Sequence, residues 1–141
     1  MKHFYEQTVY YGDTDAYGVA WHGSYLRWME QARVEFCRDI GIDLVELRTQ
    51  DVAIPVTNLN IRYKASALLD ERIVVETEIT NMTPILVQFT QTIKNKETGK
   101  IYTIGTVEVV AVNNSGKIYR RIPDILKAPC EQAWKKELIN A

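Results

Sequence analysis

Apolar side chains recur every three or four positions between residues 24 and 40, which is the period of an α-helix. The stripe consists of Tyr25, Met29, Ala32, Phe36 and Ile40, and Leu26, Trp28 and Val34 widen it. Polar side chains occupy the opposite face. Gly41 follows and can end the helix in a left-handed conformation. The pattern predicts one long helix that is largely buried.

Beyond Ile54 and Pro55 the period changes from 3.6 residues to two, which indicates strands with one buried face. The run from Ile101 to Val112 is apolar on both faces, as expected for a strand in the middle of a sheet. The glycine-containing stretches NKETGK and NNSGK separate neighbouring strands as turns. With an alternating stretch near the N-terminus included, the predicted strands cover residues 4–11, 57–64, 73–79, 85–93, 101–112 and 118–121.

The C-terminal residues predict one more helix. Pro123 or Pro129 can open it, and we expect it to be exposed because it carries Lys135, Lys136 and Glu137. The element order is thus a strand, a long helix and then several antiparallel strands, which predicts an α+β fold in a single domain over residues 1–141. A curved sheet of about five or six strands wrapped around the long helix satisfies this order.

One helix cannot cover both faces of such a sheet. Val74, Leu86 and Val110 lie on the second side of their strands and would stay unburied in a single chain. We therefore expect a partner subunit, in a homodimer or in a homotetramer built as a dimer of dimers.

The composition excludes several classes of protein. Seventeen basic and eighteen acidic residues are mixed along the chain, so no basic stripe favours binding to nucleic acid or to an anionic membrane. No apolar run is long enough for membrane insertion, and the first residues lack the apolar core of a secretion signal. Cys37 and Cys130 are far apart and have no CxxC partner, which argues against a disulfide framework. We expect a cytoplasmic protein with two reduced thiols.

The stretch YYGDTDAYGVAWHGSYLRWMEQAR, residues 10–33, concentrates polar side chains where the first strand gives way to the long helix. A plain connection needs turn-forming residues and one N-cap, and Asp13, Asp15 and His22 exceed that need. The stretch therefore predicts an active site. Two carboxylates and an imidazole are also competent metal ligands, but no HExxH motif, cysteine cluster or further histidine except His3 supports a metal site.

The same residues resemble the pattern of a known family. The pattern begins with a tyrosine, the triplet D-T-D and a G-V pair, which are here Tyr11, Asp13-Thr14-Asp15 and Gly18-Val19. It continues with a histidine, a second tyrosine and the helical E-x-A-R, which are here His22, Tyr25 and Glu30-Gln31-Ala32-Arg33. This pattern resembles the hotdog-fold acyl-CoA thioesterases of the 4-hydroxybenzoyl-CoA thioesterase type, and most closely their Tol-Pal-associated branch. The element order extends the resemblance over nearly the whole chain. Ser66 stands where the family usually has proline, and Ala20-Trp21 replace a more common aliphatic-aromatic pair.

The resemblance implies a hotdog fold and the hydrolysis of an acyl-CoA to a free acid and CoA, without a metal or redox cofactor. It assigns the chemistry to Asp15, whose carboxylate can attack the thioester carbonyl or deprotonate water. The main-chain N–H of His22 is the expected oxyanion donor, at a helix start where unpaired N–H groups favour negative charge. Gly18 provides either a left-handed turn or a close approach of the backbone to the thioester.

Other residues are expected around this centre. The His22 imidazole can orient water or protonate the departing thiolate, or it can be a structural histidine. Trp21 and Tyr25 are expected to line the acyl pocket, although aromatic residues beside a buried helix also serve as core. Arg62 and Lys64 are candidates for binding the CoA phosphates.

Two further features are expected to be structural. Asp13 should accept N–H groups within its loop, and Glu30 could pair with Arg33 along the helix.

Two alternative functions on the same fold remain. A hydratase or dehydratase needs an acid and a histidine placed along an acyl chain, and a non-catalytic acyl-CoA-binding module needs only the pocket.

Overall fold

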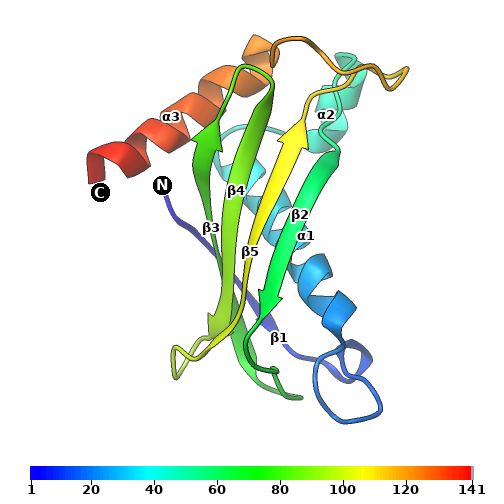
Figure 1. Ribbon diagram of the computed structural model, residues 1–141, viewed down its shortest axis with the longest axis vertical. Helices are drawn as coiled ribbons and strands as arrows, with labels where there is room; N and C mark the ends of the chain where they lie inside the picture. The colour runs from blue at the N-terminus through cyan, green and yellow to red at the C-terminus, as the bar shows by residue number, and fades with distance from the viewer. Residues whose placement is uncertain (141) are drawn as a thin grey trace.

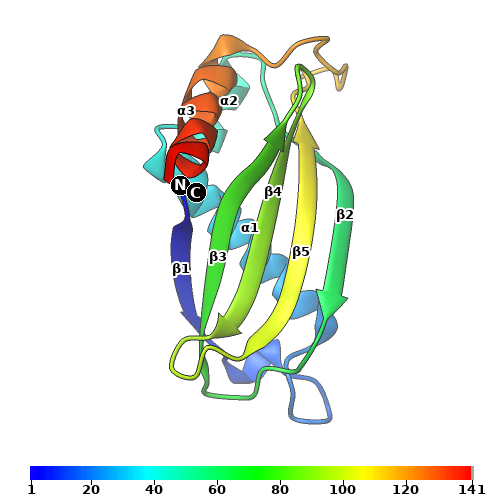
Figure 2. The same ribbon diagram turned by 60° about the vertical axis from the view of Figure 1, so that its left-hand side comes forward.

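The computed structural model describes the backbone of residues 1–140 and the side chains of residues 1–136. Five antiparallel strands form one curved sheet in the order β1-β3-β4-β5-β2, and α1 (His22–Asp39) crosses one face of it (Figures 1 and 2). The strands are β1 (His3–Thr8), β2 (Val56–Tyr63), β3 (Arg72–Met82), β4 (Leu86–Asn95) and β5 (Ile101–Val110). The predicted α+β fold, with one long helix against a curved sheet, is confirmed.

The strands β3, β4 and β5 follow one another as hairpins, whereas β2 departs from the chain order. β2 precedes β3 in the sequence but pairs with β5 at one edge of the sheet, and β1 pairs with β3 at the other edge (Figure 2). Residues 118–121 form no strand, because Ile118 makes only a single bridge to Val112. That prediction was wrong. The first strand is also shorter than predicted, since a 3-10 turn at Tyr11–Asp13 replaces its last residues.

The helix α1 lies close to the sheet at Gly105 of β5, where an added Cβ would require Met29 to move. A Cβ on Gly105 would lie 2.8 Å from Cε of Met29. Beside this contact, the Arg33 guanidinium donates to Oε1 of Gln91 on β4, and Nε2 of Gln91 donates to the Met29 carbonyl. Arg33, which was expected to pair with Glu30, thus ties the helix to the sheet. These bonds hold the middle of α1 against the sheet.

The last helix, α3 (Asp124–Asn140), is not the exposed helix that the sequence predicted. Its buried face consists of Leu126, Cys130 and Ala133, spaced as one helical stripe. Lys135 and Lys136 are exposed as expected, and the side chain of Glu137 lies outside the described residues. The helix follows Pro123 and contains Pro129.

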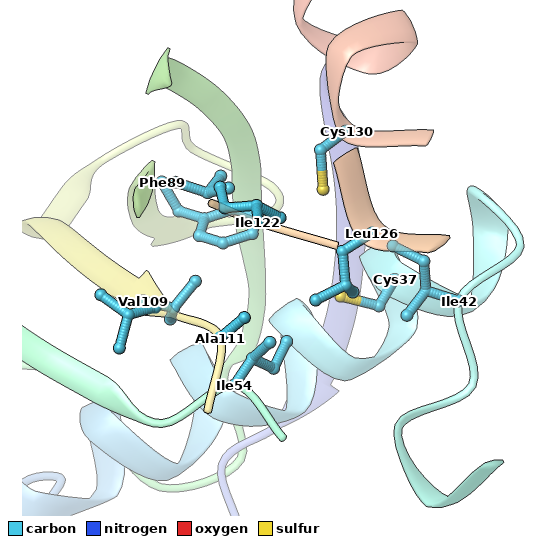
Figure 3. Close-up of a pocket in the computed structure, with 11 residues that line it drawn as sticks. Cys37, Ile42, Ile54, Phe89, Val109, Ala111, Ile122, Leu126 and Cys130 are labelled. Atoms are coloured by element: carbon cyan, nitrogen blue, oxygen red, sulfur yellow. The ribbon is translucent and has the colours of Figure 1, made fainter. Parts of the chain in front are cut away.

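A small apolar cavity of about 20 Å³ lies between α1, α3 and the sheet (Figure 3). Cys37 of α1 and Cys130 of α3 both line it, together with Leu126 and Phe89. Burial raises the pKa of the Cys37 thiol to about 11 and that of Cys130 to about 12. Both thiols are therefore protonated at neutral pH and act as small hydrophobic side chains.

The exposed apolar residues of the sheet are not the ones from which a partner subunit was predicted. Val74 and Val110 are already buried within one chain. The exposed element is instead β2, where every residue except Ile61 is exposed. Its exposed apolar side chains include Val56 and Leu59. The prediction of a half-buried strand is thus wrong for a single chain, because β2 lies at the sheet edge.

Candidate active site

An open hollow lies where α1 begins, β2 ends and the loop of residues 13–20 folds back, at one end of the molecule (Figure 1). It brings together Asp15, His22, Tyr25 and Lys64 of the predicted site residues. The helix α3 lies at the opposite end of the sheet (Figure 2). The hollow is therefore formed by the same stretch of sequence that predicted an active site.

Asp13 holds the loop against the first turn of α1. Its side chain is buried, where its carboxylate accepts the Tyr10 N–H (2.9 Å) and pairs with Arg27. Its main-chain carbonyl accepts the Trp21 N–H and the Ser24 hydroxyl, both at 2.8 Å. All the acceptor groups of Asp13 thus serve the local structure, as expected from the sequence.

Asp15 is held by a tight turn but keeps one carboxylate oxygen free. The Gly18 N–H donates to the Asp15 carbonyl (3.1 Å), and Gly18 itself has a φ of +78°, which favours glycine. Oδ1 of Asp15 accepts the Tyr17 N–H at 2.8 Å. Within the described part of the chain, Oδ2 has no hydrogen-bond partner. The turn therefore fixes this carboxylate and leaves one oxygen for chemistry.

The N-terminus of α1 faces the same hollow without a side-chain cap. Trp21 occupies the N-cap position and provides no capping hydrogen bond. Among the described residues, the N–H groups of His22 and Gly23 have no backbone acceptor, as is usual for the first turn of a helix. Together with the helix dipole they favour negative charge at this end of the hollow.

The opposite wall comes from the end of β2 and the residues after it. Tyr63 donates its hydroxyl to the His22 carbonyl (2.8 Å), and its ring packs edge-to-face on Tyr25. The Tyr25 hydroxyl accepts the Ala67 N–H at 2.9 Å. Sequence reasoning missed Tyr63. Its place in the period-two pattern, on the same face as Leu59 and Ile61, is the signal that it faces α1.

Two predicted substrate-binding residues lie outside the hollow. The Arg62 side chain is exposed and, as the neighbour of Tyr63 in a strand, points to the other face of the sheet. Trp21 is 52% exposed, and its ring packs on His22 above Gly23. A Cβ on Gly23 would lie 2.2 Å from that ring, so glycine permits this position of Trp21. Trp21 flanks the hollow and does not line it.

The two tyrosines of the hollow, Tyr25 and Tyr63, stay neutral at neutral pH. Burial raises the pKa of Tyr25, and the Glu71 and Asp15 carboxylates raise it further. Burial also raises the pKa of Tyr63.

Among the described residues, no three His, Cys, Asp or Glu side chains are grouped to hold a metal ion, and no helix is long and apolar enough to span a bilayer.

Comparison with known proteins decides the family. Residues 17–102 match the sequence model of the thioesterase superfamily. The chain belongs to this superfamily. It is 36% identical over 124 residues to the acyl-CoA thioester hydrolase YbgC of Escherichia coli, covering 88% of this chain and 92% of the relative. It is 35% identical over 115 residues to a putative esterase of Synechocystis, covering 81% of this chain and 69% of the relative.

Solved structures agree with this assignment. A DHNA-CoA thioesterase from Staphylococcus aureus superposes with a TM-score of 0.85 at 27% identity, covering 98% of this chain and 91% of that one. This chain therefore has the hotdog fold and is a thioester hydrolase, as the resemblance implied. The match to the superfamily begins at residue 17, so Asp13 and Asp15 lie outside it.

Proposed function

We propose that this thioesterase hydrolyses acyl-CoA thioesters to a free acid and CoA, and that Asp15 carries the reaction. The single observation behind this proposal is the free oxygen of Asp15 in the same hollow as the uncapped start of α1. A nucleophile or base on one side and unpaired N–H donors on the other are the two parts that acyl transfer requires.

The reaction follows from these parts. The thioester carbonyl oxygen lies toward the N–H groups of His22 and Gly23, which stabilise the negative charge that develops during attack. Either Asp15 attacks the carbonyl carbon and water hydrolyses the resulting anhydride, or Asp15 takes a proton from an attacking water. In both routes the C–S bond breaks, CoA leaves as a thiolate that takes a proton, and the acid is released. Both routes depend on the same carboxylate.

The experiment is a thiol-release assay over short aliphatic, long aliphatic and aromatic acyl-CoA substrates and acyl-carrier-protein thioesters. We expect turnover of at least one CoA thioester by the wild-type chain. A chain that binds acyl-CoA but releases no thiol from any of these substrates would support a binding module instead. Hydration of an enoyl-CoA without thiol release would support a hydratase.

We also propose that the active form is at least a homodimer that pairs through β2. Among the described residues no strand pairs with its outer edge, and Val56, Leu59 and Tyr63 are 46%, 42% and 44% exposed. A twofold axis perpendicular to the edge strand makes the two copies antiparallel. Each Val56 would then lie near the Tyr63 end of the partner's strand, next to the partner's hollow. A tetramer would be a dimer of such dimers.

In the proposed dimer, a groove next to the hollow is a candidate binding site for the acyl chain of the substrate. A groove between α1 and the start of β2 is lined by Val34, Leu44, Ile54 and Val56, with Arg33 at its side. In the antiparallel dimer the groove of one subunit continues from the hollow of the other. Because its lining is largely apolar, we expect it to hold the acyl group.

The remaining properties follow from the chemistry. Because the carboxylate of Asp13 is committed to Tyr10 and Arg27, we infer that the reaction needs no metal and no cofactor beyond the CoA of the substrate. Lys64 lines the hollow and is the retained candidate for a CoA phosphate. The two buried free thiols are compatible with a reducing compartment, and we infer a cytoplasmic location. Cell fractionation tests the last point.

A further inference from the structure

The hydroxyl of Tyr25 is only half satisfied within the protein. Tyr25 is 2% exposed, and its oxygen accepts the Ala67 N–H. In the part of the chain that the structure describes, no acceptor receives its hydroxyl hydrogen. Two comparable tyrosines have acceptors, since Tyr63 donates to the His22 carbonyl and Tyr102 donates to Glu71. A buried donor without an acceptor is uncommon and calls for a partner.

The surroundings hold this hydroxyl in a fixed place. The Tyr25 ring packs edge-to-face on Trp28, with a centroid distance of 5.2 Å, and on Tyr63, at 5.5 Å. Ala67 is fixed in turn, because its carbonyl accepts the Ala20 N–H at 2.9 Å. The ring and the donor that binds its oxygen are therefore both immobilised before any ligand arrives.

The Tyr25 side chain lies beside the proposed reaction centre. Tyr25 lines the hollow together with Asp15 and His22, and it follows His22 by three residues, which is one helical turn. A molecule in the hollow is thus the available acceptor. In a thioester that Asp15 attacks, the atom that gains negative charge and needs further donors is the carbonyl oxygen.

We propose that Tyr25 is a catalytic residue, whose hydroxyl donates a hydrogen bond to the thioester carbonyl oxygen beside the N–H groups at the start of α1. This role rests on the proposed function and adds a side-chain donor to it. The proton stays on Tyr25 throughout, so no other group is needed to balance the step. The hydrogen bond strengthens as charge develops on the oxygen, which raises kcat more than it lowers KM.

The groups that face the hydroxyl keep it protonated. Asp15 and Glu71 are carboxylates, and Tyr63, His22, Lys64 and Tyr102 are its other titratable neighbours. Burial and the two carboxylates raise the pKa of Tyr25 above its usual value near 10. A phenol in this setting remains a hydrogen-bond donor across the neutral pH range.

The test is the substitution Tyr25→Phe, with Tyr102→Phe as its matched control. Phenylalanine keeps the ring packing and removes the donor. Tyr102 is also 2% exposed, and its hydroxyl bonds to Glu71 and Asn95 lie outside the hollow. The control variant therefore also loses a buried hydroxyl group. We expect kcat to fall about a hundredfold in Tyr25→Phe, with KM changed less than about threefold. Tyr102→Phe should keep kcat within about twofold. Equal losses in both variants would overturn the proposed role.

A second measurement keeps the side chain in place. Incorporation of 3,5-difluorotyrosine at position 25 lowers the phenol pKa with little change in shape. A phenolate cannot donate, so kcat should decline at high pH, and the decline should occur at lower pH in the fluorinated protein than in the wild type. Identical pH profiles would contradict the role. A wild-type chain without any thiol release would overturn the proposed function as well, whereas an active wild type with unaffected Tyr25→Phe overturns this role alone.

Discussion

Two aspartates that are two positions apart have opposite tasks in this chain. Asp13 is buried, and its carboxylate binds Tyr10 and Arg27. Asp15 is partly exposed and keeps Oδ2 free. They lie apart because β1 ends at Thr8, so that Asp13 belongs to a 3-10 turn and Asp15 to the turn closed by Gly18, and no strand places both side chains on one face.

This difference predicts that substitution of Asp13 lowers the thermal stability and that substitution of Asp15 does not. Asp13→Asn removes the charge from the pair with Arg27, and since Arg27 is half exposed we expect a loss of about 1 kcal/mol, or about 3 °C in Tm. Asp15→Asn keeps its size and its bond to Tyr17, so Tm should change by less than about 1 °C. Thermal unfolding followed by circular dichroism measures both. A larger loss in Asp15→Asn than in Asp13→Asn would contradict these assignments.

Residue spacing predicted much of the site and failed at a defined point. The motif contained Asp15, His22 and Tyr25, which do share the hollow. Arg62, a predicted candidate for the CoA phosphates, does not line the hollow. Only the orientation of β2 relative to α1 shows that Tyr63 faces the hollow and Arg62 does not. Such long-range geometry is absent from a local pattern.

At the scale of elements, periodicity identified α1 and the three hairpin strands because their burial is one-sided and regular. It missed the buried face of α3, since Cys130 and Ala133 form a weakly hydrophobic stripe among charged residues. It also misjudged β2. Alternation shows which side chains share a face, but it does not show whether anything covers that face. The pairing of β2 with β5 is long-range and leaves no local signal.

The exposed edge of β2 predicts the oligomeric state. Leu59→Asp places a charge on the proposed twofold interface at a site exposed in one chain, so it should weaken the dimer with little loss of fold. Ile118→Asp, at an exposed loop position outside β2, is the control. Light scattering should give about twice 16.3 kDa for the wild type and the control, and a lower mass for Leu59→Asp.

The dimer prediction has a clear counter-result. A wild-type chain that stays monomeric at micromolar concentration would remove both the β2 interface and the acyl groove shared between subunits. A Leu59→Asp chain that remains as dimeric as the wild type would place the interface elsewhere on the molecule.

At the scale of the whole molecule, the fold places the ends of α1 in different environments. The start of the helix is open to solvent beside Asp15, whereas its end packs under α3 around the thiols of Cys37 and Cys130. The proposed catalysis and the core stability are thus separated along one element. Substitutions at one end can be tested with little change at the other.

The chemistry proposed for the open end needs no metal ion. Turnover of an acyl-CoA should therefore be unchanged within error after dialysis against EDTA, because a carboxylate and N–H donors carry the reaction. The measurement is the initial rate of thiol release before and after chelation. Loss of the rate, restored by one added divalent cation, would favour the metal alternative for Asp13, Asp15 and His22.

The most direct test of the account is thiol release by Asp15→Asn on a CoA thioester that the wild type hydrolyses. The substitution keeps the turn and removes the reactive charge, so kcat should fall roughly a thousandfold while Tm stays near the wild-type value. Rates must be read early, because deamidation of the new asparagine regenerates the acid. Wild-type turnover in freshly prepared Asp15→Asn would contradict the central claim that this carboxylate carries the hydrolysis.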